Sequence, residues 1–127
     1  MTALQPVEGG PLFVDAPTGS PTALCASSCS ECKRVEFPRR SLCAACGAAA
    51  VAIELKGPAR LRVLTAVLAP PPGAKVPAPY EVGVAEFPEG ICVIGLVSGP
   101  ARKGDSVVPV VTEPYDGGRI FAFGRAG

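Results

Sequence analysis

Four cysteines in the first half of the chain constrain its fold more than any other feature. They form two Cys-x₂-Cys pairs, Cys29 with Cys32 and Cys43 with Cys46, separated by ten residues. Each pair can point two thiolates toward one position, and Zn²⁺ prefers four soft ligands in a tetrahedron. The 127-residue chain contains no histidine, so an all-cysteine site is the simplest interpretation. The spacing therefore predicts structural zinc in a ribbon over residues 25–50.

Other uses of these cysteines stay open from the residues alone. An iron centre of the rubredoxin type, a redox dithiol or disulfide bonds would use the same side chains. The paired spacing favours a metal in a reducing compartment. The start of the chain lacks the pattern of a secretory signal, and no apolar run is long enough to span a bilayer. We therefore expect a cytoplasmic protein without membrane association.

Two further cysteines are expected to lie outside the metal site. Cys25, four residues before Cys29, is interpreted as a small apolar side chain near the site, although ligation is an alternative. Cys92 lies in an apolar, strand-like run and is interpreted as inert core. Neither cysteine has a histidine that could activate it as a nucleophile.

Four cations lie between the cysteine pairs: Lys33, Arg34, Arg39 and Arg40. Four thiolates around one Zn²⁺ carry a net negative charge, so these side chains are candidates to donate N–H groups to sulfur. Solvated surface positions are the alternative explanation.

The second half of the chain has the pattern of consecutive β-strands. Apolar alternation with period two, or a short apolar run, marks residues 51–55, 59–68, 80–87, 91–97, 106–111 and 119–123. In the second of these segments, Leu61 and Val63 are expected on one face. Because closure removes exposed sheet edges, the pattern predicts an all-β fold: a zinc ribbon followed by a five- or six-stranded OB-like Greek-key barrel.

The remaining segments are expected to be extended. The Gly- and Pro-rich start predicts an arm with one apolar anchor at residues 12–14, which either lies across a partner or is frayed. The proline-rich stretch 70–79 predicts a stiff loop, either a contact surface or a connector. The chain is thus divided into an arm (1–24), a zinc ribbon (25–50) and a barrel (51–127).

Composition argues against two classes of function. A nucleic-acid-binding barrel needs a basic groove with aromatic platforms, whereas this chain has net charge +1, 6% aromatic residues and no tryptophan. Catalysis is disfavoured because the chain has no histidine and no cluster of carboxylates. With 48% hydrophobic and 18% charged residues, the composition indicates an apolar surface for a partner.

Several motifs carry a resemblance to a known family. In order, they are the first cysteine pair, Phe37-Pro38-Arg39, the second pair followed by Gly47, Pro79-Tyr80, and Phe87-Pro88-Glu89-Gly90. Over residues 29–123, the chain resembles the acyl-CoA-associated OB-fold family with a rubredoxin-like zinc ribbon. Within that family it is similar to the small subunit of a benzoylsuccinyl-CoA-type thiolase.

The resemblance implies a non-catalytic accessory subunit that binds a thiolase-type catalytic subunit in a hetero-oligomer. Such a subunit helps to form the acyl-CoA site in the degradation of aromatic or other CoA-activated acids. Zn²⁺ is the implied structural cofactor, and a coenzyme A thioester is the implied ligand of the complex. Lys75, Arg102 and Lys103 are candidate contacts to the CoA phosphates, with ordinary surface cations as the alternative. The alternative functions are an accessory subunit of an acyl-CoA hydratase and a nucleic-acid-binding zinc-ribbon/OB module.

Overall fold

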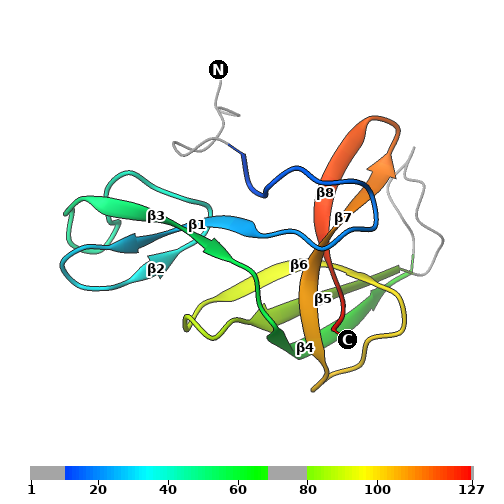
Figure 1. Cartoon of the computed structure of the whole chain (residues 1–127). Coiled ribbons are helices and arrows are strands. Elements are labelled where there is room, and N and C mark those ends of the chain that lie inside the picture. Colours follow the sequence, from blue (N-terminus) through cyan, green and yellow to red (C-terminus); the bar gives the residue numbers. More distant parts are fainter. Residues whose placement is uncertain (1–10, 69–79, 127) are drawn as a thin grey trace.

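The computed structural model describes residues 11–68 and 80–126, and these form an all-β structure (Figure 1). Its strands are β1 (Leu24–Cys29), β2 (Val35–Glu36), β3 (Ala50–Leu55), β4 (Ala59–Val67), β5 (Tyr80–Glu86), β6 (Cys92–Ser98), β7 (Ser106–Tyr115) and β8 (Gly118–Arg125). The described residues include no helix long and apolar enough to cross a membrane. The predicted proline-rich loop at 70–79 lies outside the described residues.

The first three strands form a small antiparallel sheet in the order β2-β1-β3. β1 pairs with β3 along its whole length, from Leu24 opposite Leu55 to Cys29 opposite Ala50. The predicted boundary between ribbon and barrel falls at residue 50, at the start of β3. The structure instead places all of β3 in the ribbon sheet, because the second cysteine pair turns the chain back along β1. Figure 1 shows this ribbon projecting from one side of the barrel.

The last five strands close into a barrel in the order β4-β5-β6-β8-β7, with β7 returning to pair with β4. β6 and β8 are parallel, with Leu96 opposite Ala122, and the other neighbours are antiparallel. A five-stranded Greek-key barrel in which the fifth strand returns beside the third is the OB arrangement. The predicted fold class, a ribbon followed by an OB-like barrel, is confirmed.

β4 does not alternate as the sequence predicts. Leu61 pairs with Ala85, but Val63 pairs with the next residue of β5, Val84, so β4 has one extra residue at Arg62. Such a β-bulge reverses the face on which the following side chains lie. Leu61 is fully buried, whereas Val63 is 51% exposed. The prediction that these two side chains share a face is therefore wrong.

Ribbon and barrel share one hydrophobic core. Leu24, Ala26 and Leu55 of the ribbon belong to the same buried cluster as Phe121 and Phe123 of the barrel. Further members of this cluster include Ala59, Leu61, Ala85, Phe87, Val93 and Val107. The ribbon is thus packed into the barrel at its inner end, while its outer end extends away from the core.

The described part of the N-terminal arm packs on the chain's own barrel. The backbone N–H of Gly19 donates to Val111 O at 2.8 Å. The guanidinium of Arg119 bonds the Asp15 carboxylate at 3.1 Å and the Thr18 hydroxyl at 2.9 Å. The predicted apolar anchor includes Phe13, whose ring centroid lies 6.5 Å from that of the core residue Phe121.

Two glycines allow the strands to approach inside the barrel. Gly83 of β5 pairs with Gly95 of β6. A Cβ on Gly83 would lie 2.7 Å from Leu61 Cδ1 and 2.8 Å from the backbone oxygen of Val63. Real Cβ atoms do not reach such distances, and the carbonyl belongs to the ladder, so it cannot move aside cheaply.

Gly83→Ala is expected to lower the free energy of unfolding by about 1–3 kcal/mol, the usual cost of overpacking a core. Gly124→Ala is the matched control, because the nearest atom to its new Cβ, Val110 Cγ1, is 3.4 Å away. Urea denaturation of both variants measures the difference. Equal midpoints would contradict close packing at Gly83.

Candidate metal centre

The four paired cysteines gather at the outer end of the ribbon. All four Sγ atoms lie within 4.8 Å of one another. Sγ separations are 3.4 Å for Cys29–Cys46, 3.7 Å for Cys32–Cys43 and 3.8 Å for Cys32–Cys46. Zn–S bonds of about 2.3 Å in a tetrahedron place sulfurs about 3.8 Å apart. The cluster therefore has the size and the donor set to hold a metal ion such as Zn²⁺.

The same turn occurs at both cysteine pairs. The N–H of Lys33 donates to Cys29 O at 3.2 Å, and the N–H of Gly47 donates to Cys43 O at 2.9 Å. Lys33 and Gly47 both have a left-handed backbone, with φ of 68° and 78°. Glycine adopts this conformation freely, whereas lysine does so at a cost. The two equivalent turns bring the two pairs of sulfurs together.

Backbone amides stabilise negative charge on the sulfurs. The N–H groups of Glu31 and Cys32 each donate to Cys29 Sγ at 3.4 Å, and the N–H of Ala45 donates to Cys43 Sγ at 3.3 Å. Such donors favour a thiolate over a thiol. The spacing of the cysteines does not identify these donors, because every residue has a backbone and only its conformation aims the N–H group.

The cations of the ribbon have a different role from the one hypothesised. Among the described residues, no lysine or arginine side chain donates to these sulfurs. Lys33 Nζ bonds Ser30 O at 3.2 Å, and Arg34 and Arg40 lie 3.4 Å and 3.9 Å from the Glu36 carboxylate. The same carboxylate accepts the N–H of Ala44 at 3.2 Å. Glu36 thus ties β2 to the second cysteine pair, a role that no sequence pattern revealed.

The four thiols have unequal acidities. The N–H of Cys32 is the main cause that lowers the pKa of Cys29 to about 6. The N–H of Cys46 likewise lowers the pKa of Cys43. For Cys32 and Cys46 the strongest single contribution, a backbone N–H, lowers the pKa. Burial and the hydrogen bonds shared with neighbouring thiols together outweigh this contribution. They raise the pKa of Cys32 to about 11 and also raise the pKa of Cys46.

The two remaining cysteines lie outside the cluster. Cys25 is buried in β1, 6% exposed, as expected for a small apolar side chain. Cys92 is exposed at the start of β6, so its prediction as inert core is wrong. The alternation of β6 explains the error, because Val93 faces the core and its neighbours therefore face outward.

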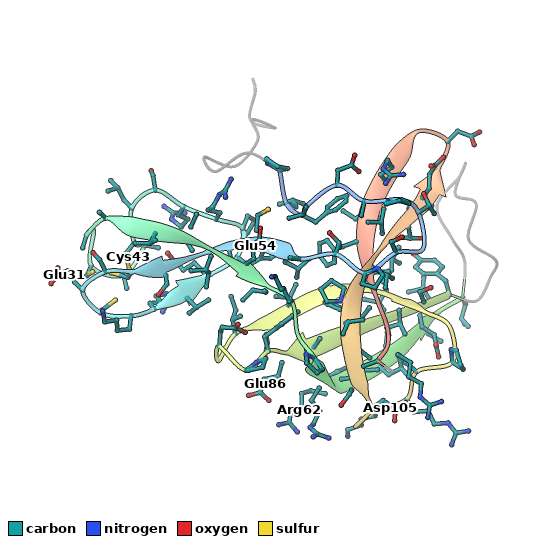
Figure 2. The ribbon with its side chains drawn as sticks, in the orientation of Figure 1. Glu31, Cys43, Glu54, Arg62, Glu86 and Asp105 are labelled. Atoms are coloured by element: carbon teal, nitrogen blue, oxygen red, sulfur yellow. The ribbon has the colours of Figure 1, made fainter. Side chains whose placement is uncertain are left out.

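Two of the predicted coenzyme A contacts, Arg102 and Lys103, lie on the barrel, away from the metal cluster. Figure 2 shows Cys43 near the outer end of the ribbon and Asp105 on the far side of the barrel. Arg102 and Lys103 are exposed on the turn before β7, where the N–H of Arg102 donates to Asp105 Oδ2 at 2.9 Å. Arg60 of β4 lies beside this turn, where its guanidinium donates to Gly104 O at 2.9 Å. Lys75 lies outside the described residues.

A four-cysteine ribbon joined to a five-stranded OB-like barrel defines the structural class of this chain. No protein-family model matches the sequence, and no curated protein matches it. Several solved structures share the fold. The one named "Ltp2-ChsH2(DUF35) aldolase" has a TM-score of 0.67 and 24% identity, over 83% of this chain and 86% of that chain.

The second structure is a protein of unknown function from the DUF35 family of Sulfolobus solfataricus. It has a TM-score of 0.57 and 20% identity, over 82% of this chain and 76% of that chain. The chain therefore shares the fold of these two DUF35 structures. Identity at this level establishes the fold alone.

Replacing one ligand is expected to abolish metal binding. Cys43→Ser should reduce bound zinc, measured by atomic emission on the purified protein, from one ion per chain to near zero. Cys25→Ala is the control, since Cys25 lies outside the cluster. A full zinc content in Cys43→Ser would contradict the four-ligand site.

Metal binding is expected to release protons. At neutral pH, Cys32 and Cys46, whose pKa values are raised, hold protons that a metal must displace. Calorimetry in two buffers of different ionisation enthalpy should therefore report at least two protons released per ion. Affinity should fall as pH falls, because protons compete with the metal for thiolates. A binding heat independent of the buffer would contradict these protonation states.

Proposed function

We propose that the chain is a non-catalytic accessory subunit that binds a thiolase-type catalytic subunit in a hetero-oligomer. In this proposal the chain helps to form the acyl-CoA site of that subunit, in the degradation of aromatic or other CoA-activated acids. The observation that carries the proposal is the shared fold with the DUF35 structure whose name joins ChsH2 to Ltp2 in an aldolase. An accessory role is the simplest explanation for a barrel that exposes apolar side chains and carries few residues suited to catalysis.

The residues of the chain support a non-catalytic role. Acyl transfer by a thiolase requires a nucleophilic cysteine with a base and an oxyanion hole. Four of the six cysteines belong to the metal cluster, and Cys25 is buried. Cys92 is exposed, but the chain has no histidine that could serve as its base. In this proposal Zn²⁺ is structural, and the reducing cytoplasm keeps the ligand thiols available.

The name of the same DUF35 structure favours a second candidate partner, a catalytic subunit of aldolase type. An acyl-CoA hydratase remains a further alternative. The present chain has the same accessory role with each of these partners. The thiolase, aldolase and hydratase alternatives differ in the identity of the catalytic subunit.

Purification of the tagged chain from its native host at natural abundance tests the proposal. We expect a thiolase-fold subunit in stoichiometric amount, identified by mass spectrometry, and thioester turnover only when both subunits are present. An aldolase or hydratase in its place would select the corresponding alternative. A lone, monodisperse chain, or turnover of a thioester by the isolated chain, would contradict the accessory role.

In the reconstituted complex, the double variant Arg102→Ala/Lys103→Ala is expected to bind acyl-CoA roughly tenfold more weakly, about 1.4 kcal/mol. Two cations that contact phosphate would be lost. Lys33→Ala/Arg34→Ala, which removes two exposed cations of the ribbon, is the matched control. Equal affinity in both double variants would remove Arg102 and Lys103 from the acyl-CoA site.

A further inference from the structure

The outer face of β4, β5 and β6 carries a continuous row of apolar side chains. Val63 pairs with Val84, and Val84 pairs with Ile94, so the three side chains lie side by side across three strands. Ile94 is 68% exposed and Val63 is 51% exposed. The neighbouring row, Val82 and Leu96, is half-buried. We call these five residues the outer apolar face.

This face does not belong to the core of the barrel. Gly83, Ala85 and Val93, which alternate with its members along β5 and β6, fill the interior. The bulge at Arg62 turns Val63 outward, because without the extra residue Val63 would lie on the buried side with Leu61. Grouped exposed aliphatic residues usually mark a contact surface, whereas single ones need no explanation.

One end of the outer apolar face has an excess of positive charge. Figure 2 shows Arg62, Glu86 and Asp105 along the same end of the barrel. Contacts among the neighbouring strands and turns gather these charged residues there: Arg60, Arg62, Arg102, Lys103 and Arg125, against Glu86, Glu89 and Asp105. Five cations and three carboxylates leave a net charge of about +2 at this end.

The ion pairs at this end leave cations available. Arg62 Nε lies 2.6 Å from Glu86 Oε1, and Arg125 Nε lies 3.8 Å from Asp105 Oδ2. The side chains of Arg102 and Lys103 make no ion pair in the part of the chain that the structure describes. A surface that binds here is therefore complementary if it is apolar in its middle and acidic at one end.

We infer that the catalytic subunit docks on the outer apolar face and presents to it an apolar strip that ends in carboxylates. The occupant rests on the proposed function, whereas the position of the surface rests on the geometry above. A second copy of this chain fits less well, because it would bring the same excess of cations and no acidic strip.

Cys92 provides a native reporter of this contact. It is exposed on β6, two residues before Ile94 and opposite Glu86, at the border of the face. Cys25 is buried, whereas Cys32 and Cys46 are exposed but belong to the metal cluster. Alkylation of Cys92 is therefore followed on the metal-loaded protein, by mass spectrometry of the peptide that contains Cys92. Docking on the face should slow the reaction of Cys92 with iodoacetamide.

The test uses the full-length chain and the purified catalytic subunit that co-purifies with it. Ile94→Arg should weaken binding more than tenfold, measured by interferometry, because it places a charge in the apolar contact. Val51→Arg is the matched control, because Val51 is 58% exposed but lies on β3 of the ribbon. The affinity of this variant for the catalytic subunit should stay within threefold of the wild-type value. Thermal melting and zinc content verify that both variants fold.

Further readouts use the wild-type chain. Alkylation of Cys92 should slow at least tenfold in the complex, and binding should weaken as salt is raised. If Ile94→Arg binds as tightly as Val51→Arg and Cys92 reacts at its free rate, the docking surface lies elsewhere while the accessory role stands. If the wild-type chain binds no catalytic subunit, the proposed function fails. Binding that does not weaken as salt is raised would contradict an acidic strip on the partner. If the wild-type chain self-associates and Ile94→Arg abolishes that association, the occupant of the face is a second copy of this chain.

Discussion

The ribbon depends on the convergence of four sulfur atoms at its outer end. Its inner end is secured by the shared core, in which Leu24 and Leu55 pack with the aromatic side chains of the barrel. The outer end has no such core, since Val51 and Leu42 are exposed there and β2 contains only two residues. A bound ion joining both cysteine pairs would supply the free energy that apolar burial cannot supply at this size.

The barrel is held by strand pairing and by packing among its own side chains. Closure removes its sheet edges, and the paired Gly83 and Gly95 make room inside it for Leu61 and two phenylalanine rings. This division separates the metal cluster from the surfaces to which the proposed function is assigned. The metal cluster lies at the outer end of the ribbon, while the outer apolar face and the Arg102–Lys103 turn lie on the barrel. A change of metal content should therefore act on the ribbon first.

Spacing and alternation were sufficient to predict the convergence of the four cysteines and the fold class. The two Cys-x₂-Cys pairs specify their own convergence, and alternating apolar residues specify strands that can close. Alternation could not reveal the bulge at Arg62, because one extra residue leaves the sequence pattern unbroken while it turns Val63 outward. The prediction that Cys92 is buried was wrong for a similar reason. In a continuous apolar run, the sequence does not show which side chains face the core until the strand pairing is known. The roles of Glu36 and of the amides that donate to sulfur could not be predicted from the sequence, because they depend on local backbone geometry.

Amide hydrogen exchange with and without metal tests the central claim most directly. After chelation, verified by metal analysis, amides of β1, β2 and the second cysteine pair should lose protection, while those of β5 to β8 keep it. Such a pattern would show a metal that holds the outer ribbon and a barrel that folds without it. Unchanged protection in the ribbon after complete metal removal would contradict a structural role for the four cysteines.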